Sequence, residues 1–375
     1  VINKIDLPAA RVDYVMEQAC HRGLSFGSVV NLGNSIQMGV EDLLGHYDEN
    51  YGSTSASILM LYLERVRKPA KLLRHARSLA RKGCVLVGIK SGTTTAGERA
   101  AASHTGAMAT NDTAVEALFA KAGIIRVRSK GELIDASCVL AAARGPLKGD
   151  RICVITDAGG PGVMMADELN RQGLQLPLLN DKTQARLRQI LPPESATANP
   201  IDCLPSRTAD QIQGILAILS EEEGANLDAV AVVTGNSLLS DNWDIYSEVR
   251  KAMSRCPLPI IPVFSSAVTA LEKIARYCSD GHIYFADEVE LARALGTVIR
   301  RCLPDDARSD PQGYHRELIA AALTRESAIL SPEGVAQVLE GAGFKLPRQR
   351  SVHSRSDLKT ACADVGFPLV MKVVG

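Results

Sequence analysis

Short apolar runs alternate with longer amphipathic stretches over the first 130 residues of the chain. The apolar runs lie at Ser28 to Leu32, Ile58 to Leu63, Val85 to Ile89 and Ile124 to Val127, and segments with helical spacing separate them. Alternating strands and helices are typical of a doubly wound parallel sheet covered by helices on both faces. We therefore predict a first α/β domain over residues 1–128.

The same pattern returns after a helix and a Gly-Pro-containing linker at residues 129–149. A strand is predicted at Arg151 to Thr156, and a helix is predicted from Val163. Further strand-like runs follow at Gln175 to Leu179, Ala229 to Thr234, Ile260 to Ser265 and His282 to Phe285. This repetition predicts a second α/β domain over residues 150–303.

A polar stretch at residues 304–325 is predicted to be a linker, and residues 326–375 open a third unit. Two helices are predicted there, at Pro332 to Gly341 and Ser356 to Val365, before an apolar run near the end. The chain begins at Val1 rather than Met and stops directly after this run. We expect it to be a fragment of a longer protein.

Composition narrows the class of protein. Lys plus Arg equals Asp plus Glu, at 42 each, which argues against a nucleic-acid-binding surface or a polybasic membrane patch. No apolar run reaches the length of a membrane span, and the nine cysteines contain no CxxC pair. We expect a cytoplasmic protein with no metal site and no nucleic-acid or membrane partner.

The stretch from Lys90 to Gly123 carries the first candidate chemistry. An apolar strand leads into a loop of Gly, Ser and Thr that holds one histidine, His104, and an amphipathic helix follows. Phosphoryl chemistry often uses such a strand, loop and helix, because free backbone N–H groups and a helix N-terminus favour an anion. On spacing alone, a surface role for His104 is the alternative.

Glu64 follows the carboxyl end of another predicted strand, and sites in parallel sheets form at that edge. A carboxylate that accepts a hydrogen bond from one imidazole nitrogen leaves the other free to attack phosphorus. The pair Glu64 and His104 is therefore a candidate catalytic pair. A solvated strand-end carboxylate is the alternative for Glu64.

A second glycine-rich loop, DAGGPG at Asp157 to Gly162, joins a predicted strand to a helix. Glycines let a backbone approach a phosphate closely at a helix N-terminus. The spacing differs from the G-x-G-x-x-G dinucleotide pattern, and a tight structural turn is the alternative. The segment Asn199 to Asp202, NPID, is predicted to be a proline turn.

Several of these motifs occur in one order over nearly the whole chain: NLGNS (31–35), LYLE (61–64), KSGTTTAGERAAASHTGAMA (90–109), TDAGGPGVMMAD (156–167), NPID (199–202) and GFPLVMKV (366–373). In this order the sequence resembles the NDP-forming acyl-CoA synthetases, also called ADP-forming acetyl-CoA synthetases, which are relatives of succinyl-CoA ligase. The resemblance implies two flavodoxin-like, doubly wound parallel-sheet domains followed by the truncated start of an ATP-grasp domain.

The resemblance also implies an activity. Acyl-CoA (acetyl-CoA in the named family), ADP and phosphate are interconverted with a carboxylic acid, CoA and ATP through an acyl phosphate and a phosphohistidine. In this sequence His104 matches the phosphohistidine and Glu64 the glutamate that holds it. The implied phosphate-binding residues are Gly159, Gly160, Gly162, Ser103, Thr105 and Gly106, and Lys372 matches a lysine that contacts nucleotide phosphates.

The implied cofactors are ATP or ADP, CoA and Mg²⁺, bound mostly by parts of the enzyme outside this chain. The family's CoA-binding domain and most of its ATP-grasp domain are absent, so we expect them in cis or in trans, within an oligomer. Residues 6–12 read DLPAARV where the family has an SQSGA-like motif for its first phosphate-binding helix.

Two alternatives remain. One is the regulatory domain of a protein lysine acetyltransferase, which resembles the same architecture but typically lacks the histidine. The other is a gene remnant that keeps the fold without turnover.

Overall fold

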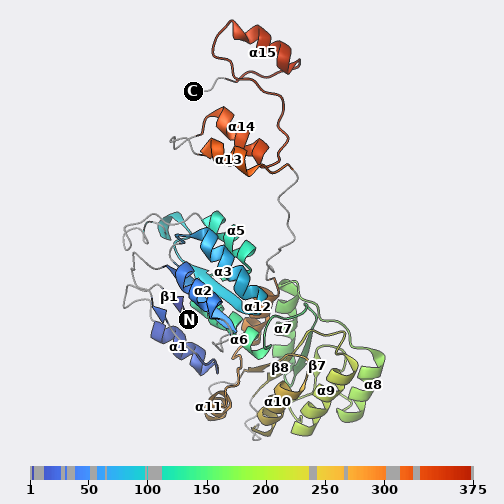
Figure 1. The fold of residues 1–375 in the computed structure, drawn as a ribbon. Helices are drawn as coiled ribbons and strands as arrows, with labels where there is room; N and C mark the ends of the chain where they lie inside the picture. The colour runs from blue at the N-terminus through green and yellow to red at the C-terminus, as the bar shows by residue number, and fades with distance from the viewer. Residues whose placement is uncertain are drawn as a thin grey trace. The chain divides into compact units, whose positions relative to one another are not determined.

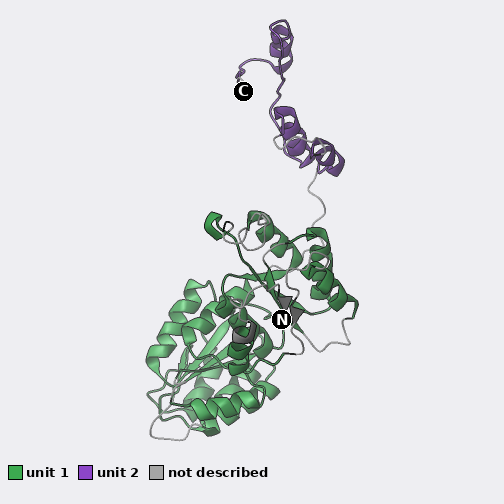
Figure 2. Ribbon diagram, turned by 90° about the vertical axis from the view of Figure 1, so that its left-hand side faces the viewer, with its two compact units in different colours: residues 1–304 green, residues 305–375 purple. Residues whose placement is uncertain are grey.

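The computed structural model describes residues 2–3, 12–26, 30–31, 39–50, 57–63, 66–97, 99, 112–235, 243–265, 269–300, 313–323 and 330–372. The chain divides into two compact units, residues 1–304 and residues 305–375 (Figure 2). Both parallel sheets of the described chain belong to the first unit, so the fold that positions the site lies there.

The first sheet has five parallel strands in the order β2-β1-β3-β4-β5. The strands are β1 (Ile2–Asn3), β2 (Val30–Asn31), β3 (Ile58–Leu63), β4 (Val85–Lys90) and β5 (Ile124–Val127). Strands β3 and β5 have the predicted bounds, and β4 extends one residue further. Because β3 and β4 are buried on both faces, nearly every residue in them is apolar.

Helices cover both faces of this sheet. Helices α2 (Val40–Glu49), α3 (Pro69–Arg81) and α5 (Asp112–Ala122) pack on one face, where they bury alternate residues of β3 and β4 (Figure 1). Helices α1 (Val12–His21) and α6 (Lys130–Ala142) pack on the other face. The doubly wound arrangement predicted from the sequence is confirmed.

The second sheet has four parallel strands in the order β7-β6-β8-β9. They are β6 (Ile152–Thr156), β7 (Ile201–Asp202), β8 (Ala229–Thr234) and β9 (Ile260–Phe264). Helices α7 (Gly159–Arg171) and α12 (Glu288–Ile299) pack on the face that α6 also covers. The opposite face is covered by α8 (Asp181–Ile190), α9 (Ala209–Glu222), α10 (Trp243–Arg255) and α11 (Leu271–Ser279).

Two predicted strands of this domain are wrong. The run at Gln175 to Leu179 makes a single bridge, from Gln175 to Arg151, and Pro177 then interrupts it because proline has no backbone N–H to donate. The run at His282 to Phe285 likewise pairs only at Phe285, with Val263, because the N-cap of α12 follows at Asp287. Part of the predicted proline turn is instead the short strand β7.

Helix α6 joins the two sheets through one continuous core. It contacts β3 and β4 of the first sheet, β9 of the second, and helices α1 and α12. Seven of its residues are buried, among them the unbroken run from Ala136 to Leu140. Five consecutive residues cover the whole circumference of a helix, so this part of α6 is enclosed on all sides. The one polar member of the run, Ser137, donates its hydroxyl to the carbonyl of Leu133 at 2.8 Å.

An ion cluster joins α2 to α3 and its C-cap, with Asp48 and His75 nearly buried and Lys82 41% exposed. Asp48 accepts a hydrogen bond from Nδ1 of His75 at 2.9 Å, and Nζ of Lys82 lies 2.8 Å from the other carboxylate oxygen. Arg74 donates to the remaining nitrogen of His75 at 3.1 Å, so both ring nitrogens are engaged and the histidine is structural. Burial opposes ionisation of Asp48, but hydrogen bonds from Lys82, Ser78 and His75 lower its pKa to about 2.

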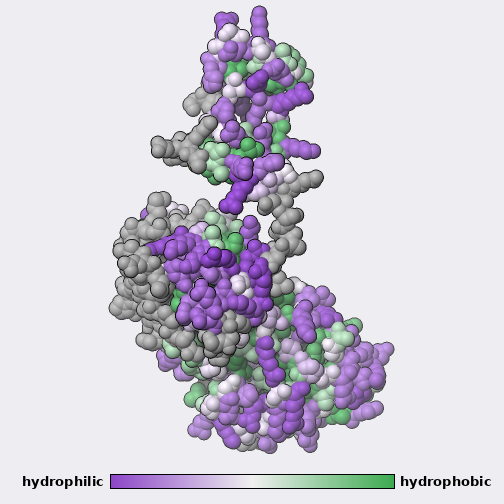
Figure 3. Space-filling model, viewed as in Figure 1, coloured by the Kyte–Doolittle hydropathy of each residue, from purple (hydrophilic) through white to green (hydrophobic). Residues whose placement is uncertain are grey.

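The second unit contains α13 (Arg316–Leu323), α14 (Pro332–Gly341) and α15 (Asp357–Val365). Helices α13 and α14 pack closely, because Gly341 has no side chain. A Cβ atom at that position would lie 2.8 Å from Cγ1 of Ile319. The predicted helix at Pro332 to Gly341 has those bounds. No helix among the described residues is long and apolar enough to cross a membrane. The described surface of the first unit is largely hydrophilic in the view of Figure 3.

The enclosure of α6 makes the two sheets of the first unit depend on each other. We expect Leu140→Ala, at a fully buried position, to lower the free energy of unfolding by about 2–5 kcal/mol. Denaturation would be followed by far-UV circular dichroism and by fluorescence of Trp243, the single tryptophan, in the second half of the unit. Both transitions should move together. Leu178→Ala, at a residue 77% exposed, is the control and should change stability by less than about 0.5 kcal/mol. A shift in only one signal would contradict the shared core.

Asp48→Asn should show how the α2–α3 cluster depends on pH. The pKa of Asp48 is lower in the folded chain than its ordinary value of 3.8, so the charged cluster stabilises the fold above pH 4. That stability is lost as the pH falls toward 2. We expect the variant to lose about 2 kcal/mol in urea denaturation at pH 7 and less at pH 3. Glu194→Gln, in an exposed turn, is the control, and an equal loss at both pH values would refute the assignment.

Candidate functional site

The carboxyl edge of the second sheet brings together the ends of three strands. Strands β6, β7 and β8 end at Thr156, Asp202 and Thr234, and β6 lies between the other two. The chain therefore runs from β6 to β7 on one side of it, and it later returns to form β8 on the other side of β6. Ligands of open α/β sheets bind at such a switch point, outside the carboxyl ends of the strands.

Helix α7 begins at this edge, and it begins earlier than predicted. Its first residue is Gly159 rather than Val163, so the glycines form the first helical turn instead of a loop. Pro161 fits there because a proline in the first turn sacrifices no hydrogen bond that the helix needs. The hydroxyl of Thr156 accepts from the amide of Ala158 at 3.1 Å and donates to its carbonyl at 2.7 Å, which holds the turn before the helix.

Two backbone amides at the start of α7 are free to bind a ligand. The amide of Gly162 donates to the carbonyl of Ala158 at 3.2 Å, and Pro161 has no N–H. Gly159 and Gly160 are exposed, and neither amide meets an acceptor within the described part of the chain. The N-cap, Ala158, has no side-chain acceptor, and the first turn contains no acidic residue. An uncapped helix N-terminus of this kind favours an anion.

The glycines differ in what their missing side chains allow. A Cβ atom at Gly162 would lie 2.7 Å from Cγ2 of Thr156, so glycine is needed for the helix to approach β6. A Cβ atom at Gly160 would meet nothing within 4 Å. At Gly159 it would lie 3.6 Å from Oδ2 of Asp202, so the carboxylate of Asp202 lies beside the first turn of α7.

A buried ion pair lies directly before this turn. Asp157 accepts from the amide of Gly235 at 2.9 Å, and its other oxygen lies 2.6 Å from Nη2 of Arg207. The two side chains are 3% and 2% exposed. Arg207 also donates to the carbonyls of Pro205 at 2.9 Å and Gly235 at 3.2 Å. The pair thus ties together the segments that follow β6, β7 and β8.

Several polar atoms near this ion pair lack hydrogen-bond partners. Within the described chain, Oδ2 of Asp157, Nε of Arg207, Oγ1 of Thr234 and the hydroxyl of Tyr246 are buried without one, so Oδ2 of Asp157 meets Arg207 as an ion pair only. Burial raises the pKa of Asp157, although Gly235 and Arg207 oppose the shift. Burial also raises the pKa of Tyr246 to about 12, so its hydroxyl stays protonated at neutral pH. Asp157 and Arg207 therefore form a polar, desolvated pair whose two charges offset each other.

The first candidate loop lies mostly outside the described residues. Glu64, Ser103, His104, Thr105 and Gly106 are not among them, so their proposed roles stay predictions. The structure does describe the root of this loop at the end of β4. There Lys90 is 4% exposed, and its Nζ donates to the carbonyls of Ser91 and Gly92. Lys372, in the second unit, is exposed, and its predicted role also stays a prediction.

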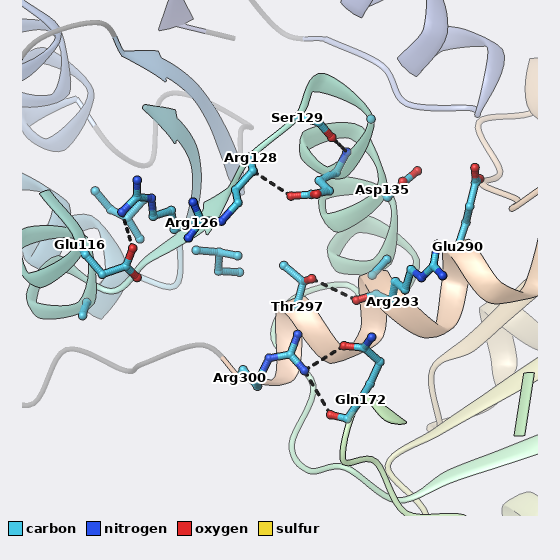
Figure 4. Close-up of a pocket in the computed structure, with 16 residues that line it drawn as sticks. Glu116, Arg126, Arg128, Ser129, Asp135, Gln172, Glu290, Arg293, Thr297 and Arg300 are labelled. Atoms are coloured by element: carbon cyan, nitrogen blue, oxygen red, sulfur yellow. Dashed lines mark hydrogen bonds and ion pairs between the residues drawn. The ribbon is translucent and has the colours of Figure 1, made fainter. Parts of the chain in front are cut away.

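A groove of about 700 Å³ lies elsewhere on the first unit, between β5, α6 and α12 (Figure 4). Four arginines line it. Arg126 pairs with Asp112 and Glu116, and Arg293 pairs with Glu168, so two of the four arginines are compensated by carboxylates. Sequence reasoning missed this groove because its residues come from segments between positions 116 and 300.

Arg207 was also missed by sequence reasoning. Asp157 was noticed as part of DAGGPG, but a partner 50 positions away in a polar connection leaves no periodic signal. Among the described residues, no group of three or more His, Cys, Asp and Glu side chains could hold a metal ion.

The packing of Gly162 and Gly160 yields a paired prediction. Gly162→Ala should destabilise the first unit by about 1–3 kcal/mol and displace the first turn of α7, because the new methyl group meets Thr156. Gly160→Ala is the matched control and should be neutral or stabilising by up to about 1 kcal/mol. Thermal denaturation of both variants checks this. Equal effects at the two positions would contradict the close approach of α7 to β6.

Comparison with known proteins agrees with the sheet architecture. The family model described as "succinyl-CoA ligase like flavodoxin domain" matches residues 9–140. An ADP-forming acetate–CoA ligase I of Archaeoglobus fulgidus is 30% identical over 96% of this chain and 51% of its own length. A 4-hydroxybutyrate–CoA ligase (ADP-forming) of Nitrosopumilus maritimus is 25% identical over 96% of this chain and 52% of its own.

A solved structure has the same fold. It is the dinucleotide-forming acetyl-coenzyme A synthetase 1 of Ca. Korarchaeum cryptofilum, in complex with phosphate and ADP. The TM-score is 0.70 at 21% identity, covering 79% of this chain and 63% of the other. This chain spans about half the length of the curated relatives named above. By its ordered motifs, its two parallel sheets and these relatives, the chain is similar over nearly its whole length to the NDP-forming acyl-CoA synthetases.

Proposed function

We propose that this chain is the phosphohistidine-bearing part of an ADP-forming acyl-CoA ligase, with acetyl-CoA as the first acyl-CoA to test. Such an enzyme converts acyl-CoA, ADP and phosphate to a carboxylic acid, CoA and ATP, and it also runs in reverse. The observation that carries the proposal is the start of α7. Two free amides lie there, on the predicted motif, in a chain similar to acetate–CoA ligases.

The proposed reaction needs two things from this chain: one nucleophile and donors that bind the phosphoryl oxygens. In the proposed step, an imidazole nitrogen of His104 attacks the phosphorus of an acyl phosphate. The bond from phosphorus to the acyl oxygen breaks, and the carboxylate leaves. Glu64 accepts the hydrogen bond from the other imidazole nitrogen and favours the cationic ring that forms. Phosphoryl transfer to ADP then regenerates His104.

The phosphoryl oxygens are assigned to backbone amides. Gly159 and Gly160 donate from α7, and Gly162 permits the close packing that aims them. Ser103, Thr105 and Gly106 are proposed to supply further donors from the loop around His104. Lys372 is proposed to contact nucleotide phosphate.

The remaining steps need CoA and a nucleotide with Mg²⁺, which are proposed to bind mainly to other parts of the enzyme. The Korarchaeum protein named above was solved with phosphate and ADP. A relative in Pyrococcus furiosus is named as a subunit alpha, which supports a multi-subunit arrangement. We therefore propose that this chain acts together with CoA-binding and ATP-grasp portions, in cis or in trans.

The test supplies the chain with acetyl phosphate labelled with ³²P. We expect a label on the protein that is lost in acid and stable in base, as a phosphohistidine is, and acetate released in equal amount. His104→Asn should remove the label, and Glu64→Gln should lower it at least tenfold.

His21→Asn is the matched control, because His21 is an exposed residue at the end of α1 and should not affect labelling. Undiminished labelling of His104→Asn would contradict the proposed nucleophile. Folding of each variant is checked by its thermal denaturation.

A further inference from the structure

The buried pair of Asp157 and Arg207 lies directly before the proposed anion site at the start of α7. Asp157 is two residues before Gly159, so their Cα atoms are at most about 7.6 Å apart. Its carboxylate is 3% exposed, and water screens it little. An uncompensated negative charge at that position would repel any anion held by the amides of Gly159 and Gly160.

Asp202 adds to this repulsion. Its Oδ2 atom lies beside Gly159, while its Oδ1 atom accepts from the amide of Leu204 at 3.0 Å. Two carboxylates therefore flank an N-terminus that is otherwise suited to an anion. Arg207 is the cation that approaches this edge, with Nη2 2.6 Å from Asp157.

We propose that Arg207 is a charge-compensating and positioning residue for the oxyanion site of α7: by neutralising Asp157, it allows a phosphate-class anion to bind at Gly159 and Gly160. This inference rests on the proposed function. It goes further by assigning a role to a residue that lies in a separate loop, outside the glycine motif.

The contacts of the pair explain why both charges are present. Asp157 fixes Gly235 through its backbone amide, and Arg207 fixes Gly235 and Pro205 through their carbonyls. The carboxylate is thus useful for holding the three strand ends together, but its charge opposes an anion. The positive charge of Arg207 offsets the negative charge of Asp157. The Nε atom of Arg207 has no acceptor among the described residues.

The test measures the affinity of the whole chain for inorganic phosphate by isothermal titration calorimetry at fixed low ionic strength. At alkaline pH, where the carboxyl of Asp157 is ionised despite its burial, we expect Arg207→Met to weaken binding roughly tenfold, because Asp157 is then left uncompensated. We expect Asp157→Asn to strengthen binding by a similar factor, because Arg207 is then uncompensated. The double variant, neutral at both positions, should bind within about threefold of the parent.

These opposite signs separate electrostatic compensation from a merely structural role. If the pair only holds the fold, both single variants weaken binding and the double variant does not recover it, which would overturn the inference. Arg207→Lys keeps the charge and should retain most of the affinity. If Arg207→Met does not fold, Asp157→Asn carries the test, since asparagine can still accept from Gly235; weaker binding by that variant would overturn the inference.

A matched control exists at the opposite edge of the same sheet. Arg151 and Asp228 form an ion pair, 2.9 Å between Nε and Oδ2, before β6 and β8 begin. The double variant Arg151→Met with Asp228→Asn should lower stability and leave phosphate affinity unchanged. If the parent chain binds no phosphate, the α7 site and this inference both fall. If the parent binds phosphate but Arg207→Met and Asp157→Asn change the affinity in the same direction, the role of Arg207 is refuted while the α7 site stands.

Discussion

The enclosure of α6 between two sheets is the constraint on which the first unit depends. Its buried residues face β3 and β4 on one side and β9 and α12 on others, so neither sheet has a complete core without it. Because the apolar surface of a helix must be covered wherever it faces, the buried run of α6 from Ala136 to Leu140 holds the elements packed around it at fixed distances. The carboxyl edges of both sheets therefore belong to one packed body.

That packed body decides how the second sheet presents its edge. Close approach of Gly162 to Thr156 places the start of α7 directly at the end of β6. The first turn then consists of two glycines and a proline, which leaves two amides exposed instead of four. Beneath them, Asp157 and Arg207 bind the ends of three strands together. Packing sets the position of the edge, and electrostatics sets which ligands suit it.

The sequence predicted the parts of the fold that depend on local pattern. Strands β3, β5 and β8 have their predicted bounds, because long apolar runs that are buried on both faces leave few alternatives. The start of α7 was predicted four residues late, since glycine and proline usually interrupt helices, and only packing on Thr156 favours them here. Arg207 could not be predicted as the partner of Asp157, because the pair forms between distant connections. The roles of Glu64 and His104 stay predictions.

An anion held by the amides of Gly159 and Gly160 would explain the arrangement of this edge. The most direct measurement is a titration of the isotopically labelled chain with inorganic phosphate, followed by the backbone amide resonances in nuclear magnetic resonance spectra. We expect saturable shifts that are largest at Gly159 and Gly160 and absent near Arg151 at the opposite edge. Saturable shifts elsewhere with none at these two glycines would contradict an anion site there.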